Sequence, residues 1–225
     1  MIPIRDAVPS RTRPIVTLAL VAATASATLL FSLIPAGGLD LSAFGDATGP
    51  GLTTRAAEWI WAAISLVRPS SWFQCITCAL ALWIFGPTVE DRVGHGRFVA
   101  LYAGCGVAAA AAAAAAGTLP ATGVLLLSGA VAGVIGAHAV LYPKARTLVL
   151  IPAPRGLDVG DVPAVLLASI WVVAQLANSL VAGAMPPGWS PRLALVQVIV
   201  GIVAGGAAVV FLKRPERMRV EWWNL

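Results

Sequence analysis

The chain has 225 residues, of which 59% are hydrophobic and 11% are charged, and its formal net charge is +5. Soluble domains carry about 25% charged residues, so this composition excludes a soluble protein and indicates that the lipid bilayer is the solvent for most of the chain. No basic patch with interleaved aromatic residues occurs, which argues against nucleic-acid binding. We therefore attribute the positive charge to membrane topology.

Six apolar stretches are predicted to cross the membrane as helices, because about 18 residues are enough to span a hydrocarbon core of roughly 30 Å. In chain order they cover residues 14–35, 71–87, 98–116, 124–142, 163–184 and 193–212. The second stretch is the shortest and should stand nearly upright in the bilayer. The pattern predicts an all-α integral membrane protein, a six-transmembrane-helix bundle that forms a single domain over residues 1–225.

Basic residues concentrate on alternate connections between these spans. Twelve Lys and Arg residues lie on one side of the threaded chain, and Arg55, Arg68 and Arg192 lie on the other. The positive-inside rule therefore places both termini, about residues 1–13 and 213–225, in the cytoplasm. The first span has a basic leader but only a poor cleavage site, so we expect it to remain as an anchor.

The longest connection, about residues 36–70, is predicted to lie on the outer side. It contains an amphipathic helical segment at residues 56–67. Trp59, Trp61 and Trp72 are typical of a helix lying in the membrane interface. A loop of this length usually has a function of its own.

All three cysteines fall inside predicted spans, so a secreted disulfide framework is excluded. Cys75 and Cys78 have the spacing of a zinc or redox pair, but no second ligand pair accompanies them, which favours small packing residues. No phosphate-binding glycine loop or carboxylate pair occurs either. The sequence therefore predicts no metal and no cofactor.

Two predicted spans carry small residues at four-residue steps. Gly129 and Gly133, with Gly136 beside them, form one such face, and Gly201 and Gly205 form the other. Faces of this kind let helix backbones approach closely in a membrane, so we expect both helices to pack tightly against partner helices.

Strongly polar residues within the predicted spans are few. They are His138, Gln74, Gln175, Asn178 and Gln197. Because ion-coupled and proton-coupled transporters need ionisable groups inside the membrane, their scarcity argues against a transporter of that class.

Several stretches, taken together and in order, resemble the bacterial rhomboid intramembrane serine proteases. They are MIPIRDAVPSRTRPIVTLALVAA at residues 1–23, LALWIFGPTVEDRVGHGRFVALYAGCG at 80–106, SGAVAGVIGAHAVLYPKAR at 128–146 and VPAVLLASIWVVAQLANSL at 162–180. The resemblance covers nearly the whole chain. It implies a six-helix core in the bacterial plasma membrane, with an active site just below the outer surface.

In that family a serine on the fourth helix is the nucleophile, a histidine on the sixth helix is the base, and an asparagine and a histidine on the second helix hold the oxyanion. Ser128 matches the nucleophile position, because Gly129, Gly133 and Gly136 follow it at the family's offsets. The glycine that precedes the serine in the family is Leu126 here, a departure that affects the backbone around the oxyanion site.

The other positions of the family's site are replaced in this chain. Anchored on the glycines of the last span, Val198 stands where the histidine belongs, and a shift of one residue offers Gln197 instead. Counting back from the Val-Glu-Asp motif, Cys78 takes the asparagine position and Gln74 the histidine position. Gln74 can still donate a hydrogen bond to an oxyanion, whereas a thiol donates only weakly.

A substitute base for Ser128 is not evident. His138 lies ten residues later, about 15 Å along the same helix. His95 is expected on a cytoplasmic loop, across the membrane, and Glu58 lies on the outer loop with a geometry that the sequence does not define. We therefore favour Ser128 as a residual nucleophile position that now acts as a small helix-contact residue.

Our leading hypothesis is a rhomboid-like pseudoprotease that binds transmembrane segments of client membrane proteins without cleaving them. An active rhomboid serine protease that uses Ser128 with a substitute base is the first alternative. A structural subunit of a membrane complex, docked through the two small-residue faces, is the second. The expected surroundings are the lipid bilayer and membrane proteins, with no nucleic acid, and the sequence indicates neither a client nor an oligomeric state.

Overall fold

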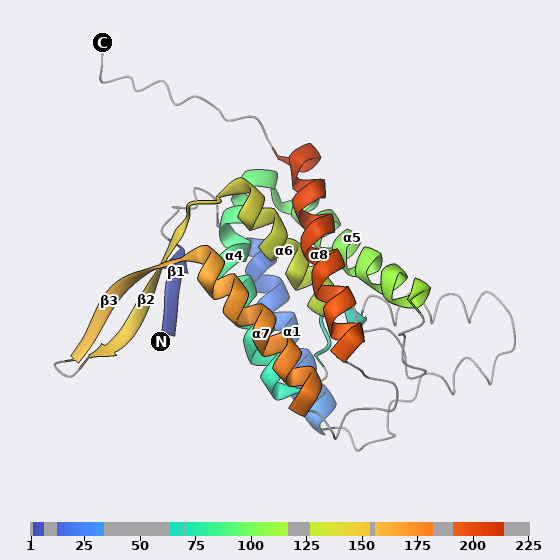
Figure 1. The fold of residues 1–225 in the computed structure, drawn as a ribbon, viewed down its shortest axis with the longest axis horizontal. Coiled ribbons are helices and arrows are strands. Elements are labelled where there is room, and N and C mark those ends of the chain that lie inside the picture. The colour runs from blue at the N-terminus through green and yellow to red at the C-terminus, as the bar shows by residue number, and fades with distance from the viewer. Residues whose placement is uncertain are drawn as a thin grey trace, which may run out of the picture.

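The computed structural model describes residues 2–6, 13–33, 64–69, 71–116, 127–153, 156–181 and 191–213. Within these ranges the chain is mostly helical, with six long helices and a small sheet beside them (Figure 1). The helices are α1 Ile15–Leu33, α4 Trp72–Val93, α5 His95–Ala115, α6 Leu127–Leu141, α7 Ala164–Val181 and α8 Pro191–Leu212.

Each predicted span overlaps one of these helices. Three described stretches, residues 72–93, 95–115 and 194–212, are long and apolar enough to cross a membrane, and three shorter apolar ones cover residues 15–30, 127–141 and 164–178. A helical membrane protein is therefore supported by length and composition. The six-span topology and the cytoplasmic position of both termini stay predictions.

The junction between α4 and α5 differs from the predicted cytoplasmic loop. The first helix continues to Val93 and the second begins at His95, so only Gly94 separates them. Gly94 has φ 89° and ψ 155°, a backbone conformation that glycine adopts without a Cβ clash. His95 consequently belongs to the first turn of α5 and lies next to the end of α4.

A three-stranded antiparallel sheet was not expected in an all-α protein. Its strands are β1 Ile2–Asp6, β2 Arg146–Ala153 and β3 Gly156–Pro163, in the order β1-β2-β3. The β-branched and aliphatic run in β2 is too short for a span but suits a strand. β3 leads directly into α7 and pairs with β2 from Arg146 opposite Pro163 to Ala153 opposite Gly156.

Helix α6 forms the centre of the bundle. Every residue from Leu127 to His138 is buried, and α6 is seen between α7 and α8 in Figure 1. A helix can be enclosed in this way only if its side chains are small enough for neighbours to approach on several sides, which its glycines and alanines allow.

The glycines of α6 and α8 lie against each other's backbones. A Cβ on Gly205 would overlap the carbonyl of Gly133, and one on Gly201 would overlap the carbonyl of Gly129. A Cβ on Gly136 would meet the backbone of Ile202. The close approach of α6 and α8 therefore depends on the absence of side chains at these positions.

On another side, α6 packs against α5 through the same kind of contact. A Cβ on Gly129 would overlap the methyl group of Ala109, and one on Gly133 would overlap the side chain of Cys105. Both glycine faces are thus in contact with helices of this same chain.

Candidate functional site

Ser128 lies in the first turn of α6 and is 4% exposed. Its hydroxyl donates a hydrogen bond of 2.6 Å to the amide oxygen Oε1 of Gln197 on α8, a length near the short end for O–H···O bonds. Gln197 is 1% exposed. The pair is positioned by the glycine contacts between α6 and α8, since Ser128 directly precedes Gly129 and Gln197 stands one turn before Gly201.

Gln197 is therefore the residue of α8 that accepts the hydrogen bond of Ser128. Val198 is also buried, at 1% exposed. Successive residues on a helix point about 100° apart, so the side chains of Gln197 and Val198 leave α8 in different directions. Positions three and four residues before Gly201 lie on the same side of the helix, which is why the sequence alone left both residues open.

The chemistry open to this pair is limited. A neutral amide oxygen accepts a hydrogen bond but does not take up a proton at ordinary pH, so Gln197 orients the Ser128 hydroxyl without activating it. His138, the other sequence candidate on α6, lies ten residues further along the helix, about 15 Å from Ser128. Its ring packs against Phe85, with centroids 5.0 Å apart, and against Tyr142, at 5.5 Å.

The two candidate residues of α4 are both enclosed. Gln74 is 2% exposed and Cys78 is completely buried. The sulfur of Cys78 accepts a hydrogen bond of 3.5 Å from Nε2 of Gln175 on α7, and the same nitrogen lies 3.2 Å from Oγ1 of Thr77. Cys78 is thus engaged with α7 through its sulfur.

A second polar contact joins α4 to α7 near the start of α4. Ser71 caps the helix by accepting a bond from the backbone N–H of Gln74, 3.1 Å long. Its hydroxyl donates to Oδ1 of Asn178 at 3.0 Å. We call Ser71, Thr77, Cys78, Gln175 and Asn178 the polar seam. The sequence had marked Gln175 and Asn178 as polar, but Ser71 and Thr77 carried no signal that linked them to α7.

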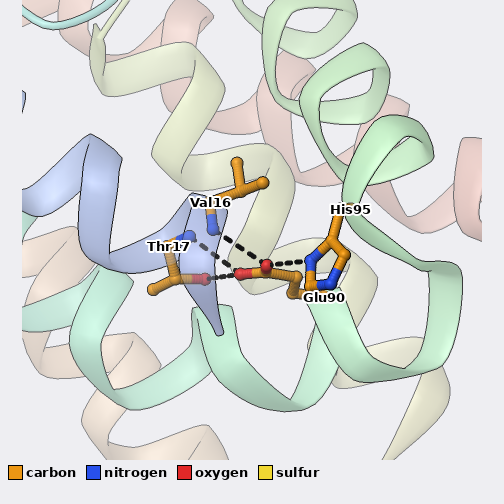
Figure 2. Close-up of polar contacts among 4 residues, drawn as sticks. All are labelled: Val16, Thr17, Glu90 and His95. Carbon is orange, nitrogen blue, oxygen red and sulfur yellow. Dashed lines mark hydrogen bonds and ion pairs between the residues drawn. The ribbon is translucent and has the colours of Figure 1, made fainter. Parts of the chain in front are cut away.

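Glu90, which had no predicted role, is a completely buried carboxylate near the end of α4. It accepts hydrogen bonds from the backbone N–H groups of Val16 and Thr17, at 2.9 and 2.8 Å, and from the Thr17 hydroxyl at 2.6 Å. Nδ1 of His95 lies 2.6 Å from Oε1, the carboxylate oxygen that also accepts the bond from Val16. Figure 2 shows the two carboxylate oxygens shared among these groups.

The Glu90 contacts satisfy the free amide groups at the start of α1, and a negative charge is favourable at a helix N-terminus. The sequence reading ended the second span at residue 87 and so counted no acidic residue within the helix. The structure extends α4 past this point. Glu90 is a structural link between α1, α4 and α5 and lies apart from the Ser128–Gln197 pair.

Some sequence candidates lie outside the described residues. They are Leu126, Glu58 and most of the predicted interfacial segment 56–67, of which residues 64–67 are described. At its described end, the Leu66 carbonyl accepts a 2.8 Å bond from the Tyr102 hydroxyl of α5. Cys75, Cys78 and Cys105 are free thiols. The described part of the chain contains no group of three or more His, Cys, Asp or Glu side chains that could hold a metal ion.

The comparisons with known proteins gave one match. A family model described as the Rhomboid domain matches residues 57–215, which includes α4 to α8 and hence Ser128, Gln197 and the polar seam. A search of curated proteins and a search of solved structures each found no match.

Proposed function

Because the chain belongs to the rhomboid family, we propose that it is a non-proteolytic member that binds transmembrane segments of client membrane proteins. On this proposal it is a six-span protein of the bacterial plasma membrane with both termini in the cytoplasm. The observation that carries the proposal is the 2.6 Å hydrogen bond between Ser128 and the amide oxygen of Gln197.

The Ser128–Gln197 contact matters for catalysis because Gln197 cannot act as the base that Ser128 would need. Peptide-bond hydrolysis by a serine needs a group that removes the hydroxyl proton as the bond to the substrate forms. An amide has no such capacity, and loss of a triad base lowers the rate by several orders of magnitude. The hydroxyl remains a buried hydrogen-bond donor that fixes α6 to α8.

The expected oxyanion donors are also altered. A thiol is a weak donor, and the sulfur of Cys78 already accepts a bond from Gln175. Removing one oxyanion donor alone costs about 10²–10³ in rate. The base and an oxyanion donor are thus changed together, which favours complete loss of hydrolysis over a modest reduction of its rate.

The polar seam and the residues beside it suit the binding of a client helix. The seam lies between α4 and α7, and large apolar side chains next to it are exposed on both helices, for example Phe73 and Ile76 on α4 and Ile170 and Val173 on α7. A client helix could pack on these apolar residues in the membrane. Where its backbone is weakened by Gly or Pro, the seam's amides and hydroxyls supply the hydrogen bonds that its backbone lacks.

The alternative of a complex subunit finds less support. It relied on the two glycine faces as docking sites, but Gly129 and Gly133 contact α5 and α8, and Gly201 and Gly205 contact α6. These faces are occupied within the chain.

The proposal is tested with purified protein in lipid nanodiscs and two fluorescent single-span peptides of equal length. One peptide carries a Gly-Pro pair at mid-span, and the other is a continuous Leu-Ala helix. We expect the Gly-Pro peptide to bind more tightly than the Leu-Ala peptide by energy transfer, and mass spectrometry to find neither peptide cleaved. Gln175→Leu should weaken Gly-Pro binding by about threefold or more, the value of an average interhelical hydrogen bond in a membrane.

Two controls accompany these measurements. Ser128→Ala should bind the peptides as the unmodified protein does. Ser26→Leu on α1 should also leave binding unchanged, because this exposed hydroxyl bonds within its own helix, to the Ala23 carbonyl. Cleavage that disappears in Ser128→Ala would establish an active protease instead, and equal binding of both peptides would exclude the client role.

A further inference from the structure

A cavity of about 170 Å³ lies at the end of α6 opposite to Ser128. Its lining comes from four helices, with Phe85 of α4, Ile135 and Tyr142 at the end of α6, Ala168 and Val172 of α7, and Ile202 of α8. Nine of its twelve lining residues are hydrocarbon side chains or glycine. This chemistry suits an aliphatic chain better than water or a peptide.

The cavity is open on the side of α7. Val165 is 56% exposed, and Ser169 and Ala139, which also line the cavity, are exposed too. In a bilayer these residues face lipid. The volume is too small for a client helix, whose diameter is about 10–12 Å, so the polar seam and this cavity suit different occupants.

Two exposed basic residues lie at the end of the cavity. Lys144 and Arg146 follow Tyr142, which lines the cavity, and the Ala145 carbonyl between them accepts a 3.0 Å bond from the backbone N–H of Ala164, another lining residue. The turn that carries both cations is therefore fixed against the start of α7. In addition, Arg146 pairs with Pro163 in the sheet, directly before Ala164.

The charge at this end of the cavity stays positive when nearby acidic groups are counted. In the sheet, Asp161 and Arg5 both pair with Leu148, and Asp6 pairs with Thr147, directly after Arg146. Together with Lys144 and Arg146, these residues carry a formal net charge of +1. No ion pair is recorded for Lys144 or Arg146 within the described ranges of the chain. A group with a single negative charge that lies where the apolar cavity meets these cations is stabilised by both.

We propose that this cavity holds one acyl chain of an anionic phospholipid whose phosphate contacts Lys144 and Arg146. Lipid tails and apolar side chains are equally hydrophobic, so a chain enters such a cavity because it restores the van der Waals contacts that a void lacks. Selectivity among lipids then comes from the headgroup charge. The cytoplasmic leaflet, which the positive-inside rule assigns to this end, is the one that carries anionic lipid.

The test compares phosphatidylglycerol with phosphatidylcholine of the same acyl chains. The full-length protein is reconstituted with both lipids at equal mole fraction, released into mild detergent and analysed by native mass spectrometry. We expect one phosphatidylglycerol to be retained at least about fivefold over phosphatidylcholine, a ratio appropriate to two exposed cations.

Two kinds of variant separate the acyl chain from the headgroup. Ala168→Phe fills the cavity and should abolish retention of either lipid, whereas Ala207→Phe, on the exposed face of α8, should not. The double variant Lys144→Gln and Arg146→Gln should reduce the ratio to about one. Its control is Arg97→Gln with Lys213→Gln, which removes one charge from the start of α5 and one from just after α8, where Arg97 donates a hydrogen bond to the Leu212 carbonyl.

Equal retention of the two lipids by the unmodified protein would overturn the proposal. So would phosphatidylglycerol retention that survives Ala168→Phe. If Ala168→Phe does not fold, Ala139→Leu fills the same cavity from α6 and answers the question instead.

Discussion

The close contact of α6 and α8 makes a quantitative prediction for Gly205→Ala. A Cβ at this position would overlap the carbonyl oxygen and carbon of Gly133, and these are backbone atoms that cannot rotate away as a side chain can. Inserting a methyl group into a filled core costs about 1–3 kcal/mol. Alanine in a helix is favoured over glycine by about 0.8–1 kcal/mol. If the overlap costs about 3 kcal/mol, Gly205→Ala should lower the free energy of unfolding by about 2 kcal/mol.

The matched control is Gly104→Ala on α5. No atom outside its own helix lies within 4 Å of a Cβ built there, so only the gain in helix propensity remains and the variant should be unchanged or more stable by up to about 1 kcal/mol. Unfolding in mixed micelles of mild and denaturing detergent measures both variants under the same conditions. The reasoning about backbone contact would be refuted if Gly205→Ala were as stable as Gly104→Ala.

Three further results are expected. Gln197→His should raise the rate at which a fluorophosphonate labels Ser128 by about 10²-fold, because an imidazole in that place is a general base. Val198→His should not raise this rate. Equal labelling of both variants would contradict the pairing of Ser128 with position 197. Glu90→Gln should lower the free energy of unfolding in detergent by about 2–4 kcal/mol, since three donors lose a charged acceptor. Thr17→Val removes only one of these bonds. If Glu90→Gln cost less than Thr17→Val, the carboxylate would not anchor α1. Gln175→Leu should speed hydrogen exchange in the first turns of α4, and unchanged exchange there would mean that Gln175 does not hold α4 to α7.

Much of the helical arrangement can be predicted from the sequence, because a helix that crosses the bilayer needs about 18 or more consecutive apolar residues. The six predicted stretches each overlap a described helix. The end of α4 was misjudged because the predicted span stopped at residue 87, whereas the helix continues to Val93. A buried carboxylate is tolerated there only because α1 supplies N–H donors from more than 70 residues away, and composition does not show such partners.

The candidate site was accessible to the sequence only in part. Ser128 was found from its family pattern, but the choice between Gln197 and Val198 depends on how α8 is rotated. That rotation is set by contacts such as Gly205 with Gly133 and Gly136 with Ile202, which join helices distant in the chain. The pairing of Gln175 with Thr77 and Cys78 is hidden for the same reason, since 97 or 98 residues separate the partners.

The attachment of α1 to Glu90 also constrains how the protein is made. The acceptor lies 73 residues after Thr17 and 74 after Val16, which corresponds to roughly 4–15 seconds of translation at about 5–20 residues per second. During that interval the ribosome has delivered the first helix but not the carboxylate that binds it. The leading amides of α1 must therefore depend on water or other polar groups until the second helix emerges.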